Sequence, residues 1–173
     1  MKNQYLPLIV GVSLPLILIL AISIVIFTPS LLVNPKHNFI YTTSSAYYPY
    51  NYEYRNTYKV ENDRLVLEAV PPRENITQTK DLPTLYVYDV RSDSAHQITF
   101  EEAQDYSIDL GPSSPDGYTL IYQYGNNGIF ELLGSGNDNR GYFISRSNGK
   151  RKLNGLAGDG WNSSNFKLIG WIK

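Results

Sequence analysis

The chain of 173 residues contains no cysteine and only two histidines, His37 and His96. Without cysteine the protein cannot form disulfide bonds or thiolate zinc sites, and it has no thiol nucleophile. The two histidines lie far apart and neither has a neighbouring histidine or cysteine, so no zinc site is expected. The chain also lacks a Gly-x-Ser-x-Gly elbow, a P-loop and a dinucleotide-binding fingerprint. We therefore expect no enzymatic activity, no cofactor and no metal.

An excess of charge of either sign is also missing. Fifteen Lys and Arg residues stand against sixteen Asp and Glu residues, which gives a formal net charge of -1. Proteins that bind nucleic acids present a strongly basic surface, because they must neutralise phosphates. A nucleic-acid partner is therefore not expected.

Charge is absent altogether from one long stretch near the N-terminus. The 33 positions between Lys2 and Lys36 contain no Asp, Glu, Lys or Arg. Within this stretch, residues 6–27 are almost entirely apolar, and as a helix they would span roughly 33 Å, enough to cross a hydrocarbon core of about 30 Å. The run is longer than the apolar region of a cleaved signal peptide, and no small-x-small cleavage site follows it. The pattern predicts a transmembrane signal anchor over residues 1–33.

The flanking charges predict the orientation of this anchor. The terminal amine and Lys2 lie closer to the apolar run than Lys36 does on the other side. Positive charge close to a membrane span favours the cytoplasmic side. We therefore expect a single-pass protein of the cell membrane, with the N-terminus cytoplasmic and the C-terminal domain extracytoplasmic.

Helical patterns are scarce in the rest of the chain. The one helix candidate is residues 100–104, whereas Gly, Asn, Ser, Pro and Asp interrupt the chain every eight to twelve residues or so. This spacing is typical of an all-β fold, here an antiparallel meander of about nine strands. The expected strands are residues 39–42, 57–60, 64–69, 84–90, 95–99, 118–124, 129–133, 141–145 and 166–172. Turns are expected around Asn62, Asp93 and the pair Asn148-Gly149, because Asn, Asp and Gly tolerate positive φ.

Two segments of the soluble part resemble each other, each with three strand-like runs separated by a turn and a loop. The first copy comprises residues 86–90, 97–99 and 114–122, and the second comprises residues 142–146, 151–153 and 163–171. The first strands of the two copies are 56 residues apart and the last strands about 48, and a period near 50 is typical of a β-propeller blade.

The first copy resembles a TolB-like (WD40-like, PD40) propeller repeat over about 40 residues. The most characteristic part is the turn formed by Ser114, Pro115, Asp116 and Gly117. Pro115 sets φ for the first corner, Asp116 can cap its own backbone, and Gly117 can take positive φ. The resemblance implies an extracytoplasmic interaction platform, or the propeller half of a serine peptidase whose catalytic domain is separate.

A closed propeller does not fit into this chain. It needs about four to eight blades, whereas residues 35–173 can hold two or three. Either the units form a small open meander, or several chains complete a ring as a homo-oligomer. We divide the chain into the anchor (1–33), a Tyr-rich juxtamembrane segment with a first β unit (34–83) and the TolB/PD40-like repeats (84–173).

Tyrosines are concentrated between the anchor and the first repeat. The candidate contact residues are Tyr47, Tyr48, Tyr50, Tyr52, Tyr54 and Tyr58. An exposed cluster of this kind suits a protein, peptide or glycan surface, because tyrosine offers a wide and stiff contact area. Several of these tyrosines alternate, which equally fits one face of an extended segment packed on a sheet.

These observations predict a membrane-anchored extracytoplasmic β domain that acts as a protein-interaction or scaffold module. The alternative is an accessory or ligand-binding subunit of a larger cell-envelope assembly. Either function implies a protein partner.

Overall fold

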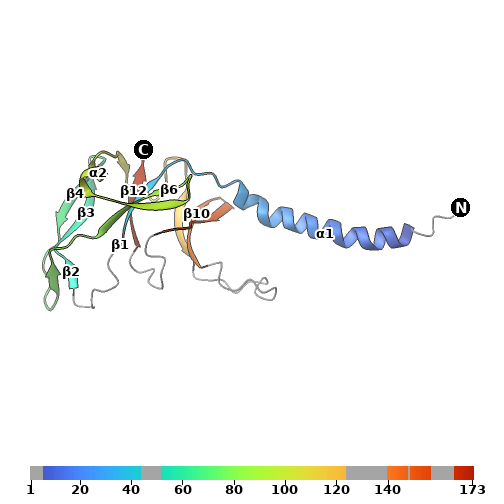
Figure 1. Cartoon of the computed structure of the whole chain (residues 1–173), viewed down its shortest axis with the longest axis horizontal. Coiled ribbons are helices and arrows are strands. Elements are labelled where there is room, and N and C mark those ends of the chain that lie inside the picture. Colours follow the sequence, from blue (N-terminus) through green and yellow to red (C-terminus); the bar gives the residue numbers. More distant parts are fainter. Residues whose placement is uncertain (1–5, 44–51, 124–139, 148, 157–165) are drawn as a thin grey trace.

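The computed structural model describes residues 6–43, 52–123, 140–147, 149–156 and 166–173, and within helix α1 it describes the side chains of residues 11–24 only (Figure 1). Two helices and twelve strands lie within these residues. The helices are α1 (Leu6–Leu31) and α2 (Phe100–Gln104). The strands are β1 (Phe39–Thr43), β2 (Tyr52–Tyr54), β3 (Asn56–Glu61), β4 (Arg64–Ala69), β5 (Thr77–Thr79), β6 (Thr84–Asp89), β7 (Ser94–Ile98), β8 (Ile108–Asp109), β9 (Thr119–Gln123), β10 (Gly141–Arg146), β11 (Gly149–Lys152) and β12 (Phe166–Ile172).

Helix α1 leads away from the β-rich remainder of the molecule (Figure 1). It is 26 residues long and contains no acidic or basic residue. In the part of the chain that the structure describes, no helix is both long and apolar enough to span a membrane. The membrane anchor expected over residues 1–33 stays a prediction.

The first and last strands of the chain lie together at the centre of the main sheet. This five-stranded sheet has the order β7-β6-β1-β12-β8, and every neighbouring pair is antiparallel. Phe39 of β1 pairs with Trp171 of β12 on one side and with Tyr88 of β6 on the other. All three of these aromatic side chains are fully buried.

Both faces of this sheet are covered. One face carries Phe39, Tyr41 and Trp171, which pack with residues of β10 and of the segment around Tyr118. The opposite face carries apolar residues of β1, β6 and β12 that pack with the β3-β4 hairpin and with α2. Successive residues of β1 and β6 therefore alternate between two hydrophobic cores, as the period of a strand requires.

A β-bulge interrupts this alternation in β12. Ile40 pairs with Gly170, whereas the next residue, Tyr41, pairs with Leu168, so Ile169 is an extra residue in the ladder. The bulge lets Leu168 and Trp171 reach the same core although three positions separate them. Gly170 lies against strand β8, and a Cβ there would be 2.6 Å from the carbonyl oxygen of Asp109.

Three smaller sheets surround the main sheet. Strands β11, β10 and β9 form an antiparallel sheet in that order, β3 and β4 form a hairpin, and β2 pairs with β5 in parallel. The expected all-β character with mainly antiparallel sheets is thus confirmed, and none of the sheets built from the described strands closes on itself.

The strand order differs from a simple meander. The first two strands of each predicted repeat do form hairpins, β6 with β7 and β10 with β11. The third strand of each repeat pairs elsewhere, because β9 joins β10 of the second copy and β12 joins β1. The two repeats therefore share strands and do not form one separate sheet each.

Several expected elements are present with the expected bounds, namely β4, β12 and α2. Helix α2 begins with a capping box, in which Thr99 and Glu102 each accept the backbone N–H of the other. Asn62, Asp63 and Asp93 adopt positive φ in the expected turns. Residues 129–133 and Asn148 lie outside the described residues. Strands β2, β5 and β8, which are two or three residues long, are not among the expected elements.

Candidate functional site

Most of the tyrosine cluster falls outside what the structure describes. Tyr47, Tyr48 and Tyr50 lie outside the described residues, and Tyr52 is described only as a backbone position of β2. Tyr54 is half-buried. These residues leave the choice between packing and contact open.

Tyr58, one of the candidate contact residues, lies in a hydrophobic core of the described structure. Its side chain is 6% exposed and stacks on the ring of Phe100, with 6.0 Å between the centroids. Burial raises the pKa of the Tyr58 hydroxyl, and the nearby Glu101 raises it further. In the alternation of β3, Tyr58 and Val60 both point into the same core, so for this residue packing explains the pattern.

A groove lies beside the β2-β5 pair and encloses about 520 Å³. Its lining residues are Arg55, Ala69, Val70, Pro71, Pro72, Gln78 and Lys80. The backbone there is held by hydrogen bonds from Val70 N–H to the Arg55 carbonyl and from the Gln78 side chain to the Val70 carbonyl. The lining combines apolar side chains with two cations and no carboxylate, so it could hold a small anionic ligand.

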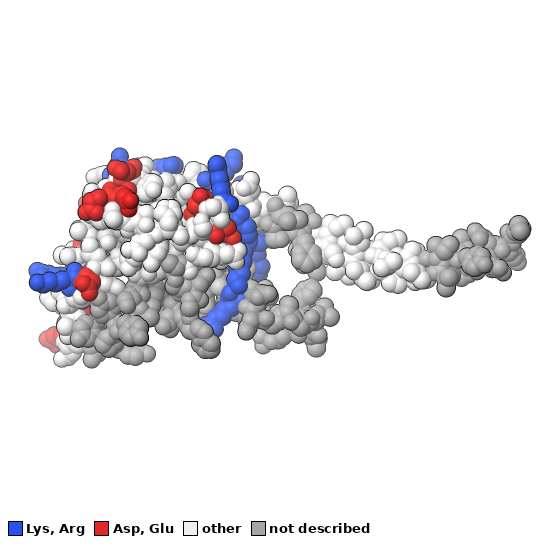
Figure 2. Space-filling model, in the orientation of Figure 1, with Lys and Arg blue, Asp and Glu red and all other residues white. Residues whose placement is uncertain are grey.

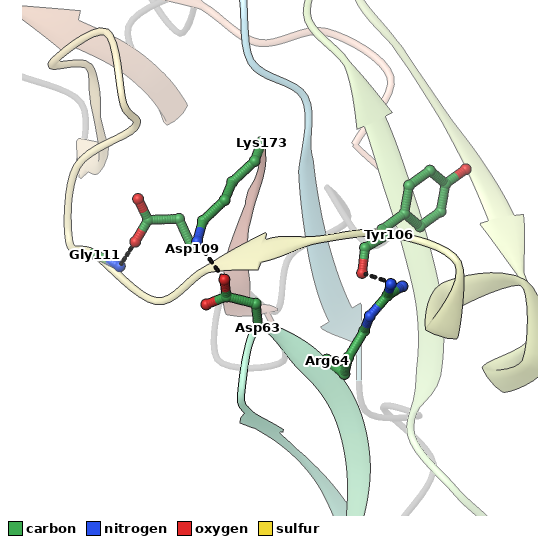
Figure 3. A network of polar contacts seen from close by, with 6 residues as sticks. All are labelled: Asp63, Arg64, Tyr106, Asp109, Gly111 and Lys173. Carbon is green, nitrogen blue, oxygen red and sulfur yellow. Dashed lines mark hydrogen bonds and ion pairs between the residues drawn. The ribbon is translucent and has the colours of Figure 1, made fainter.

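A second feature is a polar cluster where the C-terminus meets the β3-β4 hairpin (Figure 3). The Lys173 ammonium lies 2.6 Å from an Asp63 carboxylate oxygen, and Arg64 donates to the Tyr106 carbonyl. Asp109 accepts the Gly111 N–H. The Lys173 and Asp63 side chains are 41% and 57% exposed, so their ion pair contributes about 1 kcal/mol at most. This cluster links the β3-β4 hairpin to the main sheet through the ion pair of Asp63 with Lys173, and we assign it no chemical role.

The turn of Ser114, Pro115, Asp116 and Gly117 is built as the sequence predicts. Gly117 has a φ of 83° and its N–H donates to the Ser114 carbonyl over 2.8 Å. The Ser114 hydroxyl is buried, donates to Asp116 Oδ1 over 2.6 Å and accepts the Tyr118 N–H over 2.8 Å. One serine hydroxyl thus joins both ends of the turn.

The same turn also holds the segment that connects α1 to β1, here called the linker (residues 32–38). Lys36 donates its backbone N–H to Asp116 Oδ2 over 2.9 Å, and Asn34 donates its backbone N–H to the Tyr118 hydroxyl over 3.1 Å. Burial raises the pKa of Asp116, but the hydrogen bonds from Ser114 and Lys36 outweigh burial and lower it below its usual range. The carboxylate therefore bridges the turn and the linker.

Further contacts hold the linker to the main sheet. Val33 and Pro35 are buried, and Val33 packs in the core that contains Trp171. His37 Nδ1 lies 2.9 Å from the Ile172 carbonyl oxygen, and Asn38 accepts the Val90 N–H on its side-chain oxygen. The linker is thereby bonded to β12, to the end of β6 and to the Ser114 turn.

The linker is the part of the site that sequence reasoning did not identify. Turn chemistry predicts a local chain reversal at Ser114, and this accounts for only one of the two carboxylate oxygens of Asp116. The contacts of Asn34 and Lys36 use backbone N–H groups, and every residue except proline has one, so the sequence carries no signal for them. Val33 is an apolar residue of the linker, so its need for burial is a sequence signal for docking.

Comparison with known proteins gives no relative. No family model, no curated protein and no solved structure shows a significant match to this chain. The resemblance to TolB-like repeats therefore rests on the residues quoted for it and stays a prediction.

Proposed function

We propose that this protein is a single-pass membrane protein whose extracytoplasmic β domain is a protein-interaction or scaffold module. The observation that carries the proposal is the docked linker, which joins an apolar helix to the β domain through buried residues and hydrogen bonds. Such a connection presents the domain in one direction relative to α1. A flexible tether would leave that direction free.

The surface of α1 supports the membrane anchor. Its described large apolar side chains are between 49% and 65% exposed, and they are Val12, Leu14, Leu16, Ile17, Leu18, Ile19, Leu20, Ile22 and Ile24. A helix that is apolar on all sides requires apolar surroundings. Burial of each such side chain is worth about 1.5–3 kcal/mol, so leaving all of them in water would be costly. The backbone of α1 is roughly 39 Å long, whereas its described side chains, residues 11–24, cover roughly 21 Å, which alone is too short for a membrane span. The proposed span therefore rests on the apolar sequence of residues 6–27.

The edge of the main sheet supports a protein partner. Within the described strands, β7 borders the five-stranded sheet and pairs only with β6. Most of its residues are exposed or half-buried, including the exposed His96. An edge strand offers backbone N–H and C=O groups to which an extended segment of a partner can add. The TolB-like resemblance points to the same role.

Two experiments test this proposal on the full chain in its native cells. Membranes are washed with alkaline carbonate and treated with protease from each side, and we expect the chain to stay in the membrane with its β domain digested from outside only. A photo-cross-linking residue at His96 should then capture a defined protein, and the same residue at the exposed Glu68 of β4 is the matched control. Release by carbonate, or equal capture at both positions, contradicts the proposal.

The groove at Arg55 and Lys80 favours the second function, an accessory or ligand-binding subunit of a larger envelope assembly. Its volume of about 520 Å³ suits a small molecule, and its two cations favour an anion. Citrate and inorganic phosphate serve as probes in a thermal-shift assay of the full chain in detergent. A shift that disappears in the variant Arg55→Gln/Lys80→Gln supports this function, and the absence of any shift counts against it.

A further inference from the structure

Charged residues are unevenly distributed along the sequence of the β domain. Residues 140–152 carry five Lys or Arg residues and no Asp or Glu, although the whole chain has a net charge of only -1. Residues 53–109, by contrast, carry twelve acidic and six basic residues. Positive and negative charge are therefore separated along the chain.

In the structure, basic side chains gather at one end of the β domain. Figure 2 shows a band of Lys and Arg next to α1, running across the direction of the helix, with a group of Asp and Glu beside it on the side away from α1. Strand β11, with the sequence Gly-Lys-Arg-Lys, lies next to α1. We define the basic strip as Arg146, Lys150 and Lys152. Arg151 is not part of the strip, because it turns inward and donates to the Val90 carbonyl.

Two of the strip residues, Arg146 and Lys150, are exposed, and Lys152 is half-buried. The Lys150 ammonium lies 5.3 Å from the centre of the Phe143 ring and donates to the neutral side chain of Gln123. The Arg146 guanidinium lies over the ring of Tyr118, 5.6 Å from its centre. Both side chains are exposed, and these partners are uncharged. Asp116 lies at the same end, but its carboxylate accepts hydrogen bonds from Ser114 and Lys36.

The docked linker decides where this strip lies relative to a membrane. Because residues 33–38 are bonded to the β domain, the domain cannot swing away from the end of α1. With α1 across a bilayer, the strip lies close to the lipid headgroups. At physiological salt the Debye length is about 8 Å, so charges closer together than this still attract each other. Lys and Arg side chains near an anionic bilayer are attracted to it, and the attraction grows with their number.

We propose that the basic strip binds anionic lipid headgroups beside α1 and thereby holds the β domain against the membrane surface. This inference rests on the proposed membrane anchor. It adds a lipid-binding face to a domain whose other surfaces, including the edge strand β7, remain available to a protein partner.

The test uses the full chain in lipid nanodiscs, either of phosphatidylcholine alone or with one third of phosphatidylglycerol. The rate of amine acetylation is measured by mass spectrometry for each lysine. We expect the rates at Lys150 and Lys152 to fall at least threefold in the anionic discs, and to recover in high salt. Lys59 of β3 and Lys80, next to β5, are the internal controls and should react equally in both kinds of disc.

A matched pair of variants separates the strip from general charge effects. In the wild type we expect the backbone amides of residues 141–147 to exchange more slowly in anionic discs than in neutral ones. The variant Lys150→Gln/Lys152→Gln should lose this difference, whereas Lys59→Gln/Lys80→Gln should keep it. If Lys150 and Lys152 are acetylated equally slowly in both kinds of disc, protein and not lipid covers the strip, and the proposal is overturned. If they are acetylated equally fast in both kinds of disc, the strip does not contact lipid, and the proposal is overturned as well. A chain that does not co-elute with either disc contradicts the anchor itself, which distinguishes that failure from the failure of the lipid contact.

Discussion

Replacing Ser114 by alanine tests whether the turn and the linker form one structural unit. The Ser114 side chain is 4% exposed, and its hydroxyl makes two hydrogen bonds. The substitution removes the acceptor for the Tyr118 N–H, and Tyr118 is itself 6% exposed, so this N–H is left in a buried position. It also removes a donor to the Asp116 carboxylate, which holds Lys36 of the linker.

The expected loss of stability follows from these contacts. An unsatisfied buried donor costs about 1–3 kcal/mol. Water can replace the donor to Asp116, because that carboxylate lies near the surface, so we add little for it. We expect Ser114→Ala to lower the free energy of unfolding by about 2 kcal/mol, which is a factor of roughly 30 in the folding equilibrium.

The assay has a global and a local part, both on the full chain in detergent. Guanidinium unfolding followed by tryptophan fluorescence reports the global change, since Trp171 is fully buried. Hydrogen exchange followed by mass spectrometry reports the local change, and we expect faster exchange in residues 33–38. Ser92→Ala is the matched control, because the Ser92 hydroxyl is exposed and lies beside that of Ser94. If the free energies of unfolding of the two variants agree within about 0.5 kcal/mol, and the linker amides exchange at the wild-type rate in both, the turn does not hold the linker.

Three further outcomes follow from single contacts. Tyr58→Ala should cost about 3 kcal/mol or more in guanidinium unfolding, because it empties a core position, and a cost below 1 kcal/mol would place Tyr58 on the surface. Gly170→Ala should cost about 1–3 kcal/mol in the same assay, since the added Cβ would meet the Asp109 carbonyl oxygen at 2.6 Å. The pKa of Asp116 is lowered in the folded state, so its contribution is present above the unfolded value of about 4 and is lost as the pH falls through the folded value. Exchange of the linker amides, corrected for the intrinsic rate, should therefore rise only below about pH 4 in the wild type, and Asp116→Asn should remove this pH dependence.

Local sequence patterns predicted several elements with their bounds. Strand β4 and helix α2 lie where they were expected. In the structure, β4 follows a turn with Asn62 and Asp63, and α2 starts at a capping box with Thr99. These signals act between residues a few positions apart, so they operate in any fold. The three strands that were missed are short, and β8 has only Ile108 and Asp109, paired with β12. Such a strand exists because of a distant partner, and its own residues carry little signal.

The candidate site shows the same division. The residues of the Ser114 turn and its positive φ at Gly117 were predicted from turn chemistry. The contacts of the turn with the linker join residues about 80 positions apart, and they use backbone groups that no sequence pattern distinguishes. The alternation of tyrosines left packing and contact open, and burial against Phe100 decided it for Tyr58 alone.

Composition and short-range periodicity are enough to predict the all-β character and the charge-free N-terminal helix, and the positive charge of residues 140–152 can be read from the residues directly. The tertiary structure alone decided that β1 and β12, from opposite ends of the chain, pair at the centre of the main sheet. It also decided that each repeat gives its third strand to a different sheet. The physical reason is that alternation shows which side chains of a strand must be buried, whereas the strand that covers them depends on the packing of the whole chain.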